Sequence, residues 1–385
     1  MRGRMAEETA GDNGARRDRL GWRGLLCDTR RMTAAAPAHV PPAAPLFLAA
    51  RPPTRDAFFD NARFVMLALV FIGHTIEPWQ GPDRPMRALY LSLYAFHMPA
   101  FVWLAGRFAS AELTRARAIR VVERILLPLL IFQVLYAVFH HWANGTPVLE
   151  IGLVRPYWIL WFLMSLLTWR LLVPVFAVLP GAMALSVVVA LTAGLSPSID
   201  YEFSLSRTAV FLPFFLLGWR TRRQDFAWLS TRWARAASVA VLLGLVAAAW
   251  WLAPQVSERW LYASAGYASL GVGPWTGMAV RLGLLVVATV AGAAVLAWVP
   301  RRRLAWSDLG SRTLQAFLLH GFLVRGAIAA GWLAPAVLTS RASQVVLVVG
   351  AVALAALLCT AWVERALGWL VAPPVGRWLA ARHPS

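Results

Sequence analysis

The sequence predicts an all-α integral membrane protein, a bundle of about ten transmembrane helices with both termini in the cytoplasm. Of its 385 residues, 59% are hydrophobic and only 14% are charged, whereas charged residues make up about a quarter of a soluble domain. Apolar runs recur along the chain, each close to the roughly 20 residues that cross the hydrocarbon core of a bilayer. These observations exclude a soluble globular protein.

The apolar runs predict the spans, and the arginines between them predict the orientation. The net charge is +19 and the chain has no lysine. With the N-terminus inside, arginines gather in three inner loops, at 107–124, 220–235 and 301–312, as the positive-inside rule requires. The basic balance is thus explained without nucleic acid as a partner. The expected spans are 60–79, 88–108, 124–141, 157–178, 181–196, 207–220, 234–253, 274–299, 313–333 and 344–370.

The domain organisation is simple. Residues 1–55 are rich in Arg, Pro and Ala and predict a disordered cytoplasmic tail. The alternative is that the start codon is misassigned, so that part of this segment does not belong to the protein. Residues 56–372 form the transmembrane domain, and 373–385 form a short cytoplasmic tail. Cys27 and Cys359 have no metal-ligand spacing, so no metal is predicted.

Ionisable side chains in the first span are the first candidates for function, because such groups are costly in a membrane. Arg63 and His74 are 11 residues apart, within about 20° of three full helical turns, so both lie on one face. Asp60 and Glu77 lie three residues outside them, where i,i+3 neighbours interact. We expect Asp60 to hold Arg63, and Glu77 to orient His74. The alternative is that Asp60 and Arg63 only reach the membrane surface and His74 only bridges helices.

Two further histidines lie inside predicted spans. His97 is near the middle of the second span and shares a depth with His74. Two such imidazoles suit proton transfer, because imidazole titrates near neutral pH; the alternative is a pair of unrelated interhelical hydrogen bonds. His320, in the ninth span, either faces a common cavity with His74 and His97 or has only a structural role. Arg325, in the same span, has no partner in its own helix and receives no role.

A set of short motifs runs along the chain from about residue 55 to 370. The motifs are Asp60-x-x-Arg63, Gly73-His74, Phe96-His97-Met98-Pro99, Ala105-Gly106-Arg107, Arg124-x-x-x-Pro128, the runs at 158–163 and 211–219, and Leu318-Leu319-His320. Together they resemble the acyltransferase-3 family of membrane acetyltransferases, and in particular a bacterial branch similar to fucose 4-O-acetylases.

The resemblance implies a ten-helix enzyme of the plasma membrane that moves an acyl group, usually acetyl from acetyl-CoA, to a hydroxyl of a saccharide or related acceptor. At matching positions it implicates Arg63, His74, His97, Arg107, Arg124 and His320. The family commonly has Ser-Gly where this chain has Ala105-Gly106, so no hydroxyl is available there as an acyl carrier. Some relatives also carry a C-terminal extracytoplasmic domain, whereas this sequence ends shortly after its last expected span. We therefore expect transfer to end in the membrane domain or on a separate extracytoplasmic partner.

The resulting hypothesis gives each candidate a role. Arg63, Arg107 and Arg124 bind the phosphates of acyl-CoA, because guanidinium suits phosphate. His74 or His97 is the general base, and Glu77 either orients His74 or binds the acceptor. The acceptor is a surface polysaccharide, a glycolipid or a secreted metabolite. The rival hypothesis is a transporter or flippase of a saccharide or lipid-linked substrate. A structural scaffold, the third hypothesis, needs no ionisable groups at membrane depth.

Overall fold

The computed structural model describes residues 55–79, 81, 83–112, 114–196 and 201–373. Within these residues the chain is helical and contains no strand, as the sequence predicts. The predicted tail at 1–55 lies outside the described residues except for Arg55, and the tail at 373–385 lies outside except for Pro373.

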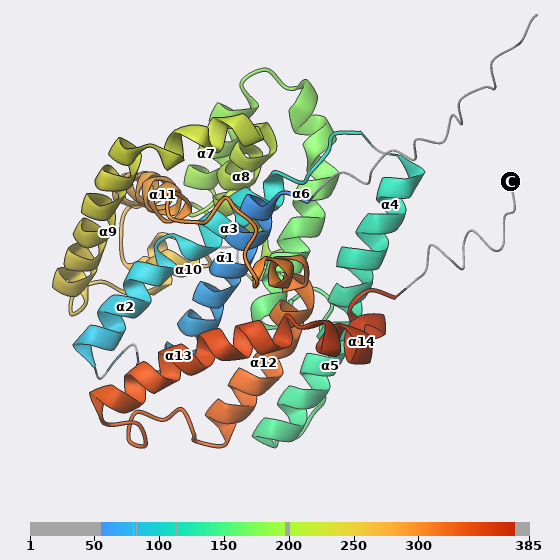
Figure 1. Ribbon diagram of the computed structural model, residues 1–385, viewed down its shortest axis with the longest axis vertical. Helices are drawn as coiled ribbons and strands as arrows, with labels where there is room; N and C mark the ends of the chain where they lie inside the picture. The colour runs from blue at the N-terminus through green and yellow to red at the C-terminus, as the bar shows by residue number, and fades with distance from the viewer. Residues whose placement is uncertain (1–54, 80, 82, 113, 197–200, 374–385) are drawn as a thin grey trace, which may run out of the picture. The chain divides into compact units, whose positions relative to one another are not determined.

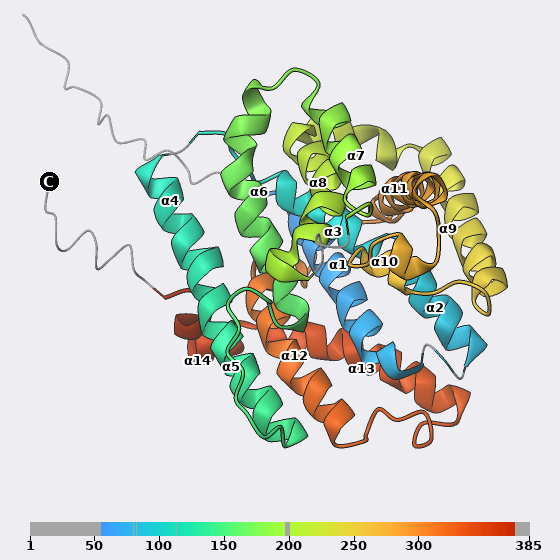
Figure 2. The same ribbon diagram turned by 180° about the vertical axis from the view of Figure 1, so that it is seen from behind.

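Figures 1 and 2 show the helices from two opposite sides. They are α1 Ala57–Thr75, η1 Glu77–Trp79, α2 Arg84–Tyr94, α3 His97–Gly106, α4 Arg115–Val121, η2 Val122–Leu126 (a π-helical turn), α5 Leu127–Asn144, η3 Trp158–Leu160, α6 Trp161–Val178, α7 Ala182–Thr192, η4 Glu202–Ser204, α8 Leu205–Arg220, η5 Arg223–Ser230, α9 Arg232–Leu252, α10 Arg259–Tyr262, η6 Ala268–Leu270, α11 Pro274–Leu296, η7 Ser307–Ser311, α12 Thr313–Ala329, α13 Arg341–Leu358 and α14 Ala361–Val371.

Seven helical stretches among the described residues are long and apolar enough to cross a membrane, so the chain is a membrane protein. Three of them join several elements: α2 with α3, α4 with η2 and α5, and η3 with α6. The helices α7, α8 and α12 are shorter, and the 11 residues of α7 rise only about 16 Å. The number of ten spans and the orientation of the termini therefore stay predictions.

Three predicted spans differ in detail from the helices. The first ends at Thr75, so Glu77 lies in the turn after α1. The second is broken between α2 and α3, because Pro99 cannot donate a hydrogen bond to the carbonyl of Ala95. A continuous helix over 344–370 is wrong, because α13 ends at Leu358 and α14 begins at Ala361.

The helix α1 lies at the centre of the packing. It contacts α3, α12, α13 and η7, and α13 runs across both α1 and α12 (Figures 1 and 2). Asn61, fully buried in α1, donates hydrogen bonds to the carbonyls of Pro300 and Arg302 and accepts one from Ser307 at 2.6 Å. These bonds fix the first helix to the segment that follows α11.

The helices α3 and α8 meet through glycine. A Cβ atom on Gly106 would overlap the carbonyl oxygen of Phe215, and one on Gly218 would overlap that of Trp103. Small residues let helix backbones approach closely inside membranes. Gly106 and Gly218 together therefore allow α3 and α8 to touch through their backbones.

Candidate active site

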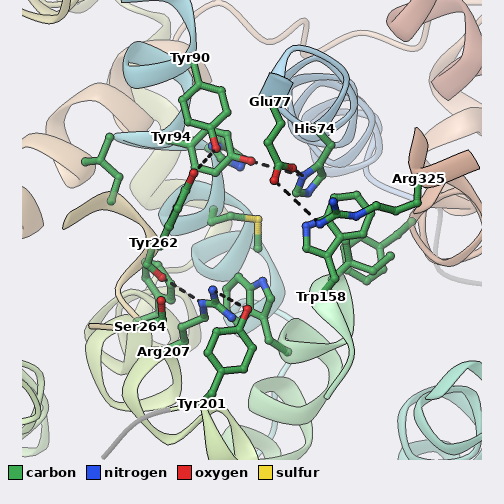
Figure 3. A pocket seen from close by; sticks show the side chains of 17 residues that line it. His74, Glu77, Tyr90, Tyr94, Trp158, Tyr201, Arg207, Tyr262, Ser264 and Arg325 are labelled. Carbon is green, nitrogen blue, oxygen red and sulfur yellow. Dashed lines mark hydrogen bonds and ion pairs between the residues drawn. The ribbon is translucent and has the colours of Figure 1, made fainter. Parts of the chain in front are cut away.

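A cavity of about 260 Å³ lies where α1 ends, and we call it the histidine cavity (Figure 3). Segments far apart in the sequence meet around it: the end of α1, the break between α2 and α3, the start of α6, the start of α8, and α12. Its lining is His74, Glu77, Tyr90, Tyr94, His97, Met98, Trp158, Ile159, Trp161, Tyr201, Arg207, Phe211, Leu261, Tyr262, Ser264, Phe317 and Arg325.

His74 occupies one wall of this cavity, and its Nδ1 atom has two neighbours. The hydroxyl of Tyr94 lies 3.3 Å from Nδ1, and Oε2 of Glu77 lies 3.7 Å from the same atom. The carboxylate distance is longer than that of a direct hydrogen bond, so Glu77 acts on His74 mainly through its charge. Burial raises the pKa of Glu77, but its interactions with His74 and Arg325 outweigh that effect and leave the pKa below its usual value. Glu77 is therefore an anion at neutral pH.

His97 lines the same cavity and is only 1% exposed. Its Nδ1 lies 2.7 Å from the carbonyl oxygen of Leu93. A carbonyl oxygen only accepts hydrogen bonds, so we assign the ring proton to Nδ1. Nε2 then keeps its lone pair, which is the state that a base requires. His74 and His97 therefore line one cavity, and their common depth in the membrane stays a prediction.

His320 lies behind His74 and does not line the cavity. Its ring is fully buried, stacks on Phe71 at 4.5 Å and lies 5.5 Å from the ring of His74. Nδ1 contacts the carbonyl oxygen of Phe317 at 2.6 Å, while Nε2 is buried and has no hydrogen-bond partner among the described residues. Of the two alternatives for His320, the one in which it faces the cavity is not what the structure shows; its ring lies against His74 instead.

Trp158 and Arg325 form the wall next to the end of α1, where the ring of Trp158 lies 4.5 Å from that of His74 (Figure 3). Cζ of Arg325 lies 4.1 Å from the centre of the Trp158 ring, and its guanidinium lies 3.9 Å from Oε1 of Glu77. Trp158 has a φ of 33°, a strained value for a residue with a side chain. The loop before it is held by Gln133, which donates to the carbonyls of Gly152 and Arg155 and accepts from the amide of Tyr157.

Arg207, at the start of α8, is the second arginine of the lining. It donates from Nε to the carbonyl of Tyr262 at 3.0 Å and from a terminal nitrogen to the hydroxyl of Tyr201 at 3.3 Å. Its guanidinium also lies 5.2 Å from the centre of the Trp161 ring. In the sequence, Arg207 stands at the predicted outer end of the expected span 207–220, and nothing there marks it as part of a cavity.

The arginines expected to bind phosphate lie toward the other end of α1, about 16 Å along the helix from His74. Arg63 pairs with Asp60 at 2.9 Å, as the i,i+3 spacing predicts, and its guanidinium lies over Phe108. The guanidinium of Arg107 lies over Phe59, and its Nε is buried without a partner among the described residues.

Arg170 lies at the same end of α1 as Arg63, whereas no hydrogen bond or ion pair among the described residues joins Arg124 to that group. Arg170, in α6, donates to the carbonyl of Phe108 at 3.0 Å, and its buried Nε has no hydrogen-bond partner within the described part of the chain. Arg124 lies in the π-helical turn η2 and its side chain is exposed. Sequence reasoning missed Arg170, although a cation inside the apolar run 157–178 is a signal of function. In the described residues, no group of three His, Cys, Asp or Glu side chains could hold a metal ion.

Comparisons with known proteins identify the family. The model described as an acyltransferase domain, that of the acyltransferase-3 family, matches residues 56–360. The chain therefore belongs to the acyltransferase-3 family of membrane proteins, as its motifs predict.

Two relatives are both named nodulation protein NolL. That of Sinorhizobium fredii (strain NBRC 101917 / NGR234) is 28% identical over 201 residues, which cover 47% of this chain and 52% of the relative. That of Mesorhizobium japonicum (strain LMG 29417 / CECT 9101 / MAFF 303099) is 30% identical over 122 residues, 28% of this chain and 33% of the relative. The chain thus spans about half the length of the first relative and a third of the second. No solved structure matches.

Proposed function

We propose that the protein is a multi-pass O-acyltransferase of the plasma membrane that moves an acyl group, with acetyl as the first candidate, from acyl-CoA to a hydroxyl of a saccharide or glycolipid. The observation that carries the proposal is the histidine cavity, in which His74 and His97 line one space beside the carboxylate of Glu77. The family match supports acyl transfer. No separate observation favours the transporter hypothesis.

His74 is the better general base of the two. A base becomes a cation when it takes a proton, and a buried cation without a counter-charge is costly. Glu77 lies 3.7 Å from His74 and supplies that counter-charge. His97 is 1% exposed and its observed partner is a neutral carbonyl. We therefore assign His74 as the base and His97 as a hydrogen-bond acceptor that positions the hydroxyl of the acceptor.

The donor's phosphates bind at the opposite end of α1. Arg63 and Arg107 present guanidinium groups there, and the arginine fork suits phosphate oxygens. Arg170 adds a third cation through α6, and its unpartnered Nε favours an anionic ligand. Arg124, exposed in η2, remains the candidate for a more distant phosphate. The pantetheine arm of acyl-CoA then extends along α1 toward the histidine cavity. In this proposal both chain termini lie on the cytoplasmic side of the membrane, from which the donor binds.

The chemistry is a single acyl transfer. Nε2 of His74 takes the proton from the acceptor hydroxyl, and the oxygen attacks the thioester carbonyl. The negative charge that develops on the carbonyl oxygen is stabilised by Arg207 or Arg325, the two arginines of the lining. When the carbon–sulfur bond breaks, the thiolate of CoA leaves and takes the proton back from His74. The ester and free CoA are the products.

Purified protein in lipid nanodiscs tests this proposal. Labelled acetyl-CoA is supplied with a panel of methyl and octyl glycosides of hexoses and deoxyhexoses, and both free thiol and acetylated sugar are measured. We expect both products from the wild type, and neither from His74→Ala. Thiol release by His74→Ala at the wild-type rate would refute the assignment of His74. A wild type that neither hydrolyses acetyl-CoA nor transfers its acetyl group would refute the function.

A further inference from the structure

A second cavity of about 320 Å³ adjoins the histidine cavity. It lies between the end of α5, the start of η3 and α12, and it shares Trp158, Tyr201 and Arg325 with the first cavity. His140 and Asn144 at its rim are exposed, so it opens to the surface. We call it the acceptor cavity. Its lining is Phe139, His140, Ala143, Asn144, Tyr157, Trp158, Tyr201, Arg325, Ile328 and Ala329.

The walls of the acceptor cavity are aromatic and rigid. The ring of Tyr157 stacks on that of Tyr136 at 5.1 Å, and Tyr136 stacks in turn on Phe322 at 4.1 Å. Tyr136 is itself fixed by a hydrogen bond to the carbonyl of Leu318. Aromatic rings with a polar edge suit ligands that are apolar on one face and polar at the rim. A pyranose ring has this character, since its C–H groups form flat faces and its hydroxyls point outward.

The polar groups of the cavity have a fixed arrangement. The amide nitrogen of Asn144 donates to the carbonyl oxygen of His140 at 3.0 Å and lies 2.9 Å from Nδ1 of the same residue. The hydroxyl of Tyr157 lies 3.1 Å from that Nδ1. Since the carbonyl only accepts, the nitrogen of the amide must face it, and Nδ1 of His140, which has a single lone pair, accepts from that nitrogen.

This arrangement leaves a donor and an acceptor for a ligand. With Nδ1 accepting, the ring proton of His140 is on Nε2, which can donate. The amide oxygen of Asn144 receives no hydrogen bond from the described residues and can accept. A donor next to an acceptor matches a pair of neighbouring hydroxyls, each of which both donates and accepts.

We propose that the acceptor cavity binds a carbohydrate ring of the acyl acceptor. Trp158 forms the wall between the two cavities, and its ring lies 4.5 Å from that of His74. A sugar in the acceptor cavity can therefore direct a hydroxyl past Trp158 toward His74. Arg325 lies on the same wall and links it to Glu77. This proposal rests on the proposed function and assigns its acceptor site.

Two variants test the proposal in nanodiscs with the glycoside that the wild type acetylates best. Asn144→Ala removes the free amide oxygen, so the KM for the glycoside should rise by roughly 2- to 10-fold, the effect of one lost hydrogen bond. Ala143→Trp fills the cavity and should abolish transfer to the glycoside. Both variants should bind CoA with wild-type affinity in equilibrium binding, because the proposed donor site at Arg63 and Arg107 lies toward the other end of α1. The matched controls are Thr192→Ala and Ala248→Trp, at exposed helical sites outside both cavities.

Binding is also measured directly, by saturation-transfer NMR of the methyl glycoside with each variant. An unchanged glycoside KM in Asn144→Ala, or full transfer by Ala143→Trp, would overturn the acceptor cavity but leave the proposed function intact. Hydrolysis of acetyl-CoA that depends on His74, without transfer to any glycoside of the panel, would overturn the carbohydrate class. Transfer to octyl but not methyl glycosides identifies a lipid-linked sugar, and transfer to both identifies a free one; either supports the proposal. Without any turnover of acetyl-CoA, the proposed function itself fails.

Discussion

Replacing Glu77 by glutamine removes one negative charge and keeps the size of the side chain. The carboxylate lies 3.7 Å from Nδ1 of His74 and 3.9 Å from the guanidinium of Arg325. Two unit charges about 4 Å apart interact by about 4 kcal/mol at an effective dielectric constant near 20. The Glu77 side chain is 24% exposed, so solvent screens part of this energy. We take about half, ~2 kcal/mol, as the stabilisation lost from the protonated His74.

A loss of ~2 kcal/mol from the transition state lowers kcat roughly 30-fold. The assay is acetyl transfer at saturating acetyl-CoA and saturating acceptor, with the affinity for CoA measured in parallel and expected to stay unchanged. Tyr94→Phe is the matched comparison, because it removes only the hydroxyl 3.3 Å from Nδ1 and should cost about 5-fold, the effect of one hydrogen bond. A kcat of Glu77→Gln within twofold of wild type would refute the electrostatic role. An increase in acceptor KM alone would instead place Glu77 in acceptor binding.

Three further predictions concern the donor site, the stability and the orientation of the chain. Arg63→Lys keeps the charge but loses the two-pronged contact with phosphate, so affinity for CoA in equilibrium binding should fall roughly 10-fold; equal affinity would exclude Arg63 from the donor site. Burial raises the pKa of Asp83, but hydrogen bonds from Gln344, the amide of Met86 and Arg341, together with the charge of Arg341, outweigh it and lower that pKa. Its stabilising contribution is therefore present above the ordinary carboxylate range and lost as pH falls below about 4; the melting temperature of Asp83→Asn should be lower than wild type at pH 7, and the difference should shrink in acid. Reporter fusions after Trp142 should report outside and those after Arg303 inside, and an external signal after Arg303 would show the orientation to be wrong.

The parts of the site that the sequence predicted are local in the chain. The i,i+3 spacing predicted the pairing of Asp60 with Arg63 and the approach of Glu77 to His74, and both contacts are present. Helical periodicity cannot predict which distant segment packs against these residues. The stacking of Arg325 on Trp158 joins α12 to the turn before α6, so neither residue reveals the other in the sequence.

The break between α13 and α14 also depends on a distant residue, so helical periodicity could not predict it. The run around Cys359 and Thr360 is apolar and has no glycine or proline, so it reads as one helix. The break exists because Gln315, from α12, donates to the carbonyls of Leu358 and Thr360 and so satisfies groups that a continuous helix would pair internally. Thr360 accordingly has an extended backbone, with ψ of 155°. A side chain 43 residues before Leu358 decides where that helix ends.

The glycine contact between α3 and α8 constrains how this protein can move. With backbones touching at Gly106 and Gly218, neither helix can slide or rotate against the other without steric overlap. His97 at the start of α3 and Arg207 at the start of α8 therefore move as parts of one rigid body. A mechanism in which two halves rock past each other to expose a substrate alternately to either side would have to carry both helices in the same half. Under the proposed function, substrates therefore reach the histidine cavity without any shift of α3 against α8.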